Sequence, residues 1–153
     1  MRIVLGLGLI LNLGCSGAAP CSRCEKIEGT YALFFEAAAI QSPDCAAVPA
    51  RPGPASVTIT RQGAELRATI YGIKGRGVQQ DTADFSISGT EEPDGGANTD
   101  TASITLRGLY RGPVLRADAG VTKPASIEGK WVTRAERGGK ICDAEQNYAG
   151  IKQ

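Results

Sequence analysis

Residues 102–110 read Ala-Ser-Ile-Thr-Leu-Arg-Gly-Leu-Tyr, and they carry the clearest structural signal in the chain. Ile104 and Leu106 alternate with three polar residues, and a period of two is typical of a β-strand that buries one face. Shorter runs with this alternation recur at 30–36, 56–61, 65–71, 84–88, 113–117 and 127–134. We therefore expect about seven to eight strands, mostly antiparallel.

Turn residues separate these runs. Gln62-Gly63 lies between two alternating segments and predicts a tight hairpin, and further turns are expected at 72–77, 91–100 and 111–113. Two brief segments, 37–39 and 142–148, could form short helices. The pattern predicts an all-β fold with disulfides, either a small antiparallel β-barrel or a sandwich.

An internal similarity favours the barrel. Residues 26–31 and 126–131 share Ile-Glu-Gly-x-aromatic, and the first and last strands of a closed antiparallel barrel are neighbours. Gly29 and Tyr31 also resemble the Gly-x-Trp that opens the barrel of lipocalins and avidins, with Tyr where that family has Trp. Trp131 and Tyr31 could form the floor of a cavity for a small apolar ligand. The expected lining residues are Tyr31, Leu33, Ile70, Ile104 and Trp131.

The amino terminus has the layout of a secretory signal peptide. One basic residue precedes the apolar run 3–11, which is too short for the ~20 residues that span a bilayer. Leu13-Gly14-Cys15-Ser16 then resembles the lipobox of bacterial lipoproteins, although Asn12 and Leu13 depart from the family pattern. The resemblance implies a diacylglycerol thioether on Cys15. The alternative is cleavage near Ala18-Ala19 without a lipid.

This interpretation divides the chain into three parts. Residues 1–14 form the signal peptide, residues 15–25 a tether, and residues 26–153 a single β domain. The mature chain of 139 residues (153 minus 14) is long enough for one core. We expect it on the cell membrane or outer membrane, facing the periplasm or the cell surface and held by its lipid.

Four further cysteines, Cys21, Cys24, Cys45 and Cys142, predict disulfides in an exported protein. Three pairings are possible, and Cys24 with Cys45 and Cys21 with Cys142 is the one we expect. Cys21 and Cys24 also have the spacing of thiol oxidoreductases, but no βαβ pattern surrounds them. A zinc site from these cysteines is improbable outside the cytoplasm.

Composition excludes several functions. The chain has no histidine, which rules out Ser-His-Asp, Cys-His and His-zinc sites, and no carboxylate pair stands out, so we expect no enzyme and no cofactor. The loop 91–100 holds four carboxylates without the alternate spacing of a calcium hand, so no metal is expected. A formal charge of +1 without basic clusters argues against nucleic acid.

Three functions remain open at this point. The first is a lipocalin-like carrier of a small apolar ligand. The second is an inhibitor or protein-binding module that acts on a lysozyme, a protease or an envelope protein through loops 111–113 or 72–77. The third is a purely structural envelope lipoprotein.

Overall fold

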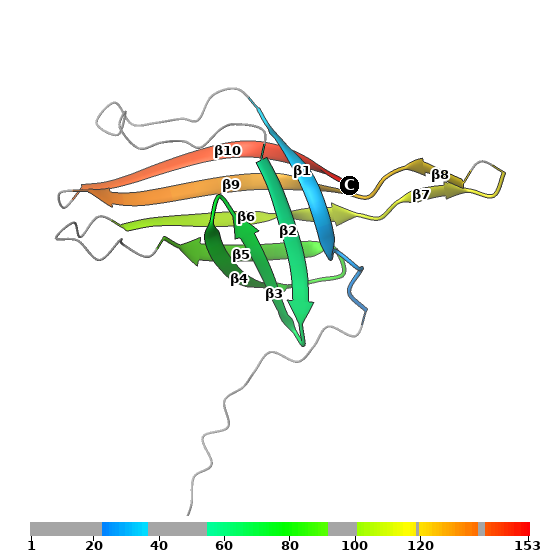
Figure 1. Ribbon diagram of the computed structural model, residues 1–153, viewed down its shortest axis with the longest axis horizontal. Coiled ribbons are helices and arrows are strands. Elements are labelled where there is room, and N and C mark those ends of the chain that lie inside the picture. Colours follow the sequence, from blue (N-terminus) through cyan, green and yellow to red (C-terminus); the bar gives the residue numbers. More distant parts are fainter. Residues whose placement is uncertain (1–22, 37–54, 92–100, 119, 138–139) are drawn as a thin grey trace, which may run out of the picture.

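The computed structural model describes residues 23–36, 55–91, 101–118, 120–137 and 140–153, and every regular element within them is a β-strand (Figure 1). Eight strands close into an antiparallel barrel in the order β1-β10-β9-β6-β5-β4-β3-β2, while β7 and β8 pair with each other. The prediction of an all-β antiparallel barrel is confirmed. Within the described residues, no helix has the length and apolarity needed to cross a membrane.

The strands are β1 Gly29–Phe35, β2 Ala55–Gln62, β3 Glu65–Ile70, β4 Ile73–Gln79, β5 Asp84–Thr90, β6 Thr101–Arg111, β7 Val114–Arg116, β8 Gly120–Lys123, β9 Ser126–Arg137 and β10 Lys140–Lys152.

The pairing of β1 with β10 closes the barrel. Leu33 lies opposite Gly150 and Phe35 lies opposite Tyr148 in this antiparallel pair. The sequence similarity between 26–31 and 126–131 led us to expect β1 beside the strand that begins near residue 126. That strand is β9, and β10 lies between it and β1.

The expectation of a short helix over 142–148 is wrong, because these residues belong to β10. Their inward side chains, Cys142, Ala144, Gln146 and Tyr148, are buried, while the residues between them are exposed. The period is therefore two, as in the other strands. Small and polar side chains at the inward positions conceal this alternation in the sequence.

The expected turn at 72–77 is also wrong beyond its first residue. Tyr71 and Gly72 make the turn, and β4 begins at Ile73. Gly77 faces Ile87 on β5, and a Cβ at Gly77 would lie 1.8 Å from the Ser86 carbonyl oxygen. This glycine marks a close approach of two strands rather than a loop. The hairpin predicted at Gln62-Gly63 is confirmed, with Gly63 at a φ of 61° in the turn.

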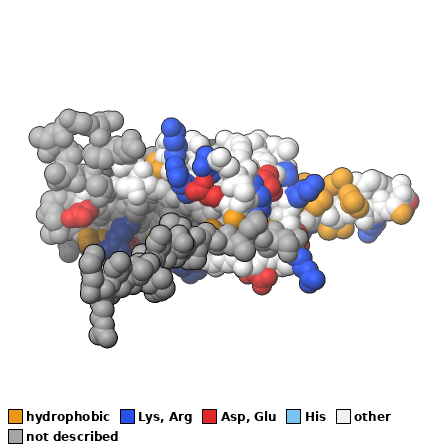
Figure 2. All heavy atoms as spheres, turned by 90° about the horizontal axis from the view of Figure 1, so that it is seen from below, with side chains coloured by type: hydrophobic (Ala, Val, Ile, Leu, Met, Phe, Trp, Pro, Cys, Tyr) orange, Lys and Arg blue, Asp and Glu red, His pale blue; other side chains and the backbone are white. Residues whose placement is uncertain are grey.

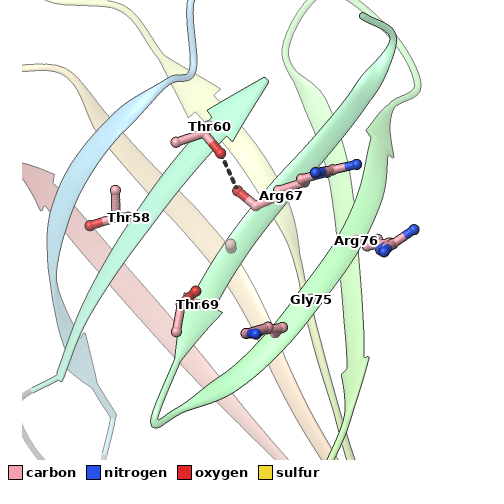
Figure 3. A pocket seen from close by; sticks show the side chains of 8 residues that line it. Thr58, Thr60, Arg67, Thr69, Gly75 and Arg76 are labelled. Atoms are coloured by element: carbon pink, nitrogen blue, oxygen red, sulfur yellow. Dashed lines mark hydrogen bonds between the residues drawn. The ribbon is translucent and has the colours of Figure 1, made fainter. Parts of the chain in front are cut away.

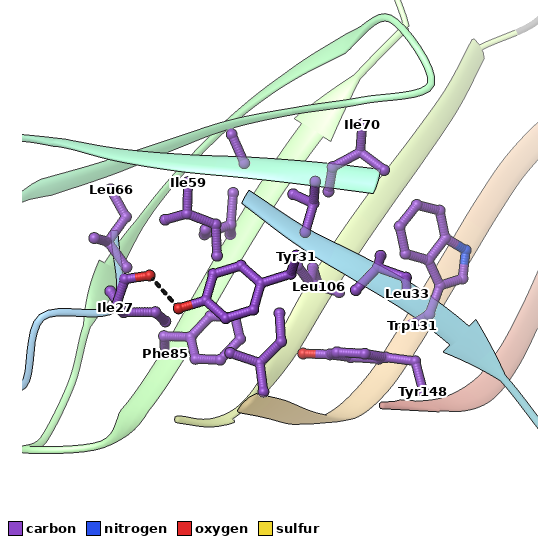
Figure 4. Close-up of a cluster of buried hydrophobic side chains, with 14 of the residues drawn as sticks. Ile27, Tyr31, Leu33, Ile59, Leu66, Ile70, Phe85, Leu106, Trp131 and Tyr148 are labelled. Atoms are coloured by element: carbon purple, nitrogen blue, oxygen red, sulfur yellow. Dashed lines mark hydrogen bonds between the residues drawn. The ribbon is translucent and has the colours of Figure 1, made fainter. Parts of the chain in front are cut away.

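Most inward side chains form one large apolar cluster in the barrel interior (Figure 4), and Ala135, Cys142 and Ala102 form a second, small one. Tyr31, Leu33, Ile70, Ile104 and Trp131 all belong to the large cluster and are at most 3% exposed. Each buried aliphatic or aromatic side chain of this size contributes roughly 1.5–3 kcal/mol to folding. The five side chains expected to line a cavity are thus buried in the core of the barrel.

Gly108 on β6 lies directly opposite Gly129 on β9. A Cβ at Gly129 would lie 2.1 Å from the Arg107 carbonyl oxygen and 2.5 Å from the Gly108 Cα. Neither neighbour is the end of a flexible side chain, so the strands themselves would have to move apart. The barrel wall therefore requires glycine at this crossing.

We predict that Gly129→Ala lowers the free energy of unfolding by about 1–3 kcal/mol, because it overpacks two backbones. Urea unfolding measures this as a lower midpoint at an unchanged slope. The control is Gly112→Ala, whose Cβ would meet no backbone atom and would lie 3.3 Å from Glu25 Oε2 and 4.0 Å from the edge of the Tyr110 ring. Equal midpoints for the two variants would contradict the packing described for β6 and β9.

Candidate functional site

Trp131 is the centre of a group of aromatic rings at one end of the barrel. The Phe35 ring lies 5.6 Å from it at 82°, and the Tyr71 ring lies 5.8 Å from it at 89°. Phe35 also contacts Tyr148 at 6.5 Å. Edge-to-face contacts of this kind are favoured by the charge distribution of aromatic rings. We call these four residues the aromatic cluster.

Buried polar side chains lie beside the indole ring. The Trp131 Nε1–H donates a hydrogen bond of 2.8 Å to Thr133 Oγ1, and Gln146 lies opposite Trp131 in the β9 and β10 register. Gln146 Nε2 in turn donates to the Glu36 carbonyl oxygen at 3.5 Å. The aromatic cluster therefore has hydrogen-bonding groups at its edge, which is the usual make-up of a small-molecule site.

Tyr71 has a strained backbone. Its φ is 51°, and among the described residues it is the one non-glycine residue at a positive φ. A bulky residue in this region is uncommon, and such strain often accompanies a functional site. The Tyr71 side chain is 37% exposed, whereas Trp131 is 1% exposed. The Tyr71 ring thus lies partly at the surface and contacts the buried Trp131 indole.

The structure separates the two aromatic residues that the sequence placed in one cavity floor. Tyr31 pairs with Val57 and Lys152, and its hydroxyl donates a 2.6 Å hydrogen bond to the Ile27 carbonyl oxygen. Trp131 instead pairs with Gln146, six residues before Lys152 on β10. Tyr31 and Trp131 are therefore at different levels of one apolar core.

Sequence reasoning missed Phe35 and Tyr71 as partners of Trp131. Phe35 continues the alternation of β1, so its inward direction was visible but its neighbour was not. The alternation of β3 places Tyr71 outside the barrel. The positive φ of Tyr71 begins the turn at this point, and the ring contacts Trp131.

Ionic and polar groups occupy the opposite end of the barrel. Arg61 Nε donates to Glu28 Oε1 at 2.9 Å, and the Arg61 guanidinium also donates to Gln79 Oε1. Gln79 Nε2 donates to the Thr82 carbonyl oxygen at 2.6 Å, and Lys152 Nζ donates to the Glu28 carbonyl oxygen at 2.6 Å. This network covers the apolar core beneath it.

Burial disfavours the ionised form of Glu28, but a backbone hydrogen bond and the Arg61 guanidinium outweigh it, and Lys152 adds to them. The pKa of Glu28 is therefore below its ordinary value of 4.5. Burial raises the pKa of Tyr31, with smaller contributions from Tyr110 and Glu28. This end of the barrel holds charges in fixed pairs and keeps the Tyr31 hydroxyl protonated.

The outer wall also has shallow hollows. One of about 320 Å³ lies on β2, β3 and β4, where Thr58, Thr60 and Thr69 stand near Arg67 and Arg76 (Figure 3). Both arginines pair with Glu65, at 2.7 Å and 3.8 Å. Arg67 and Arg76 are exposed, so this hollow lies on a solvated face of the sheet.

No family model, curated protein or solved structure matches this chain. In the part of the chain that the structure describes, no three cysteine or carboxylate side chains are grouped to hold a metal ion. Cys15, Cys21 and Cys45, and residues 92–100 of the acidic loop, lie outside the described residues.

We predict that Glu28→Gln destabilises the barrel near neutral pH and reduces its sensitivity to acid. The pKa of Glu28 is lowered in the folded state, so its ionised form stabilises the fold above about pH 4.5, and this contribution is lost as the pH falls below that value. Urea midpoints at about pH 7 and about pH 3 measure the effect. The control is Glu136→Gln on the exposed face of β9. A variant with the same pH dependence as the parent would contradict this role for Glu28.

Proposed function

We propose that this chain is an exported lipoprotein, anchored by acyl chains on Cys15, whose barrel carries a small apolar ligand without catalysing a reaction. The observation that supports this proposal is the aromatic cluster, in which the strained Tyr71 covers Trp131. An eight-stranded barrel is just wide enough to be filled by side chains or to hold one small ligand.

Tyr71 is the residue that would move. It stands in a two-residue turn between β3 and β4, so a change in this turn displaces the ring without breaking a strand. That movement uncovers the Trp131 indole and the partly buried Phe35. An apolar ligand would replace the Tyr71 ring on the indole, and release of the strained φ would offset part of the lost ring contact.

The first described residues after the proposed anchor lie at the end of the barrel opposite the aromatic cluster. Glu25, ten residues after Cys15, lies beside Gly112, just past the last residue of β6. Phe35 instead is the last residue of β1, and Tyr71 follows the last residue of β3, at the other end of the barrel. A lipid on Cys15 would thus join the chain nearer to the polar end of the barrel than to the aromatic end.

Distances along the barrel also limit which of the four cysteines can pair in the disulfides that we propose for the exported form. Glu25, next to Cys24, lies at the end of the barrel where Arg111, Ser126 and Ile151 are paired across the strands. Cys142 is nine residues before Ile151 on β10, which places it about 30 Å away along the strand. Cys21 is three residues from Cys24 and can extend at most ~11 Å, whereas disulfide Cα atoms lie within ~7 Å. We therefore favour Cys21 with Cys24 and Cys45 with Cys142 over the pairing expected from the sequence.

The alternative, a protein-binding module or inhibitor, would use the segment 111–113. Residues 73–77 belong to β4, so the second loop proposed for this role is not available. Gly112 and Pro113 connect β6 to the exposed β7, which keeps a protein partner possible at that end. A protein that co-purifies in place of an apolar ligand would favour this alternative.

Trp131 is the single tryptophan of the chain, so its fluorescence reports the proposed site directly. We predict that titration with a long-chain fatty acid changes this fluorescence to saturation, and that Tyr71→Ala alters the affinity because the displaced ring is gone. The control is Val78→Ala, on the outer face of β4. Fluorescence that stays constant with fatty acid, together with solvent extracts that contain no apolar compound, would contradict the carrier function.

A further inference from the structure

The paired strands β7 and β8, with their connection, form an arm that projects from one end of the barrel (Figure 1). Val114, Leu115 and Val121 on this arm are 50%, 67% and 61% exposed. An isolated two-stranded ribbon is only marginally stable in water. Three large exposed apolar side chains on such a ribbon form a candidate contact surface.

The surface of the arm combines apolar and basic groups. Orange side chains gather along it in Figure 2. Leu115 lies opposite Val121, and Val114 lies opposite Lys123. Arg116 and Lys123 are exposed, with Asp118 as the acidic residue among the described positions of the arm. Exposed apolar residues next to long basic side chains suit the boundary between the headgroups and acyl chains of a membrane that contains anionic lipids.

The tether limits the distance between the proposed anchor and the arm. Glu25 Oε2 lies 3.3 Å from where a Cβ on Gly112 would be, so the tether meets the barrel at the base of the arm. Glu25 lies ten positions after Cys15, which allows at most about 35 Å of extended chain between them. A bilayer that holds acyl chains on Cys15 is therefore within reach of the arm.

We propose that the β7–β8 arm, residues 114–123, docks on the surface of the membrane that holds the anchor, with Leu115 and Val121 inserted at the acyl boundary. The proposal rests on the lipid anchor proposed above. It gives the anchored barrel a second contact, and so a fixed orientation with the aromatic cluster facing away from the membrane. An anchor at the single residue Cys15 would not by itself fix this orientation.

The test uses the protein as purified from its own membrane, reconstituted in vesicles of phosphatidylcholine and phosphatidylglycerol. The reporter variant carries Leu115→Trp with Trp131→Phe, and brominated lipids quench indole groups that reach the acyl boundary. The matched control carries Ile141→Trp with Trp131→Phe, because Ile141 is 53% exposed near the start of β10, at the other end of the barrel. Circular dichroism verifies that both variants keep the β fold.

We expect a blue shift and a loss of fluorescence on bromination for the Leu115→Trp protein and neither for the Ile141→Trp protein. Flotation with the vesicles reports the anchor separately. Protein that floats with an unquenched Leu115→Trp reporter would overturn the arm proposal and leave the anchor in place. Protein that fails to float would overturn both. A blue shift that depends on protein concentration without quenching would show the arm buried against a second copy, and would also overturn the proposal.

Discussion

The antiparallel pairing of β1 with β10 is the constraint on which the rest of the structure depends. It joins the first described barrel strand to the last, with Ala32 opposite Ile151, 119 positions later in the chain (151 minus 32). No barrel strand therefore keeps an open edge. The Gln153 N–H donates to the Thr30 carbonyl oxygen at 2.9 Å and continues the pairing to the end of the chain. Because β1 supplies Tyr31 and Leu33 to the core, an open seam would expose the apolar interior.

Closure also gives the barrel two different ends. Residues 25–28, the arm and the carboxyl terminus lie at one end, where Arg61, Glu28 and Gln79 cover the core with paired polar groups. The aromatic cluster lies at the other end. A lipid anchor attached to the first end and an apolar site at the second would divide membrane attachment from ligand binding along one barrel axis.

The sequence predicted the strands whose two faces differ strongly in polarity. Ile104 and Leu106 on β6 are buried and their neighbours are not, so that strand was evident. β4 was missed because Gly75 and Gly77 look like loop residues, although they permit close strand contact. β10 was missed because its inward positions hold small or polar residues. The contact between Tyr71 and Trp131 joins a turn to a distant strand, and no local pattern predicts it.

The most direct test of the account is the intact mass of the protein taken from its native membrane, recorded before and after reduction with alkylation. The account predicts a chain that begins at Cys15 and carries acyl groups, with four cysteines that react after reduction. An unacylated chain that begins after Ala19 would contradict the anchor, and with it the orientation proposed for the barrel. Four thiols that react before reduction would contradict the disulfides.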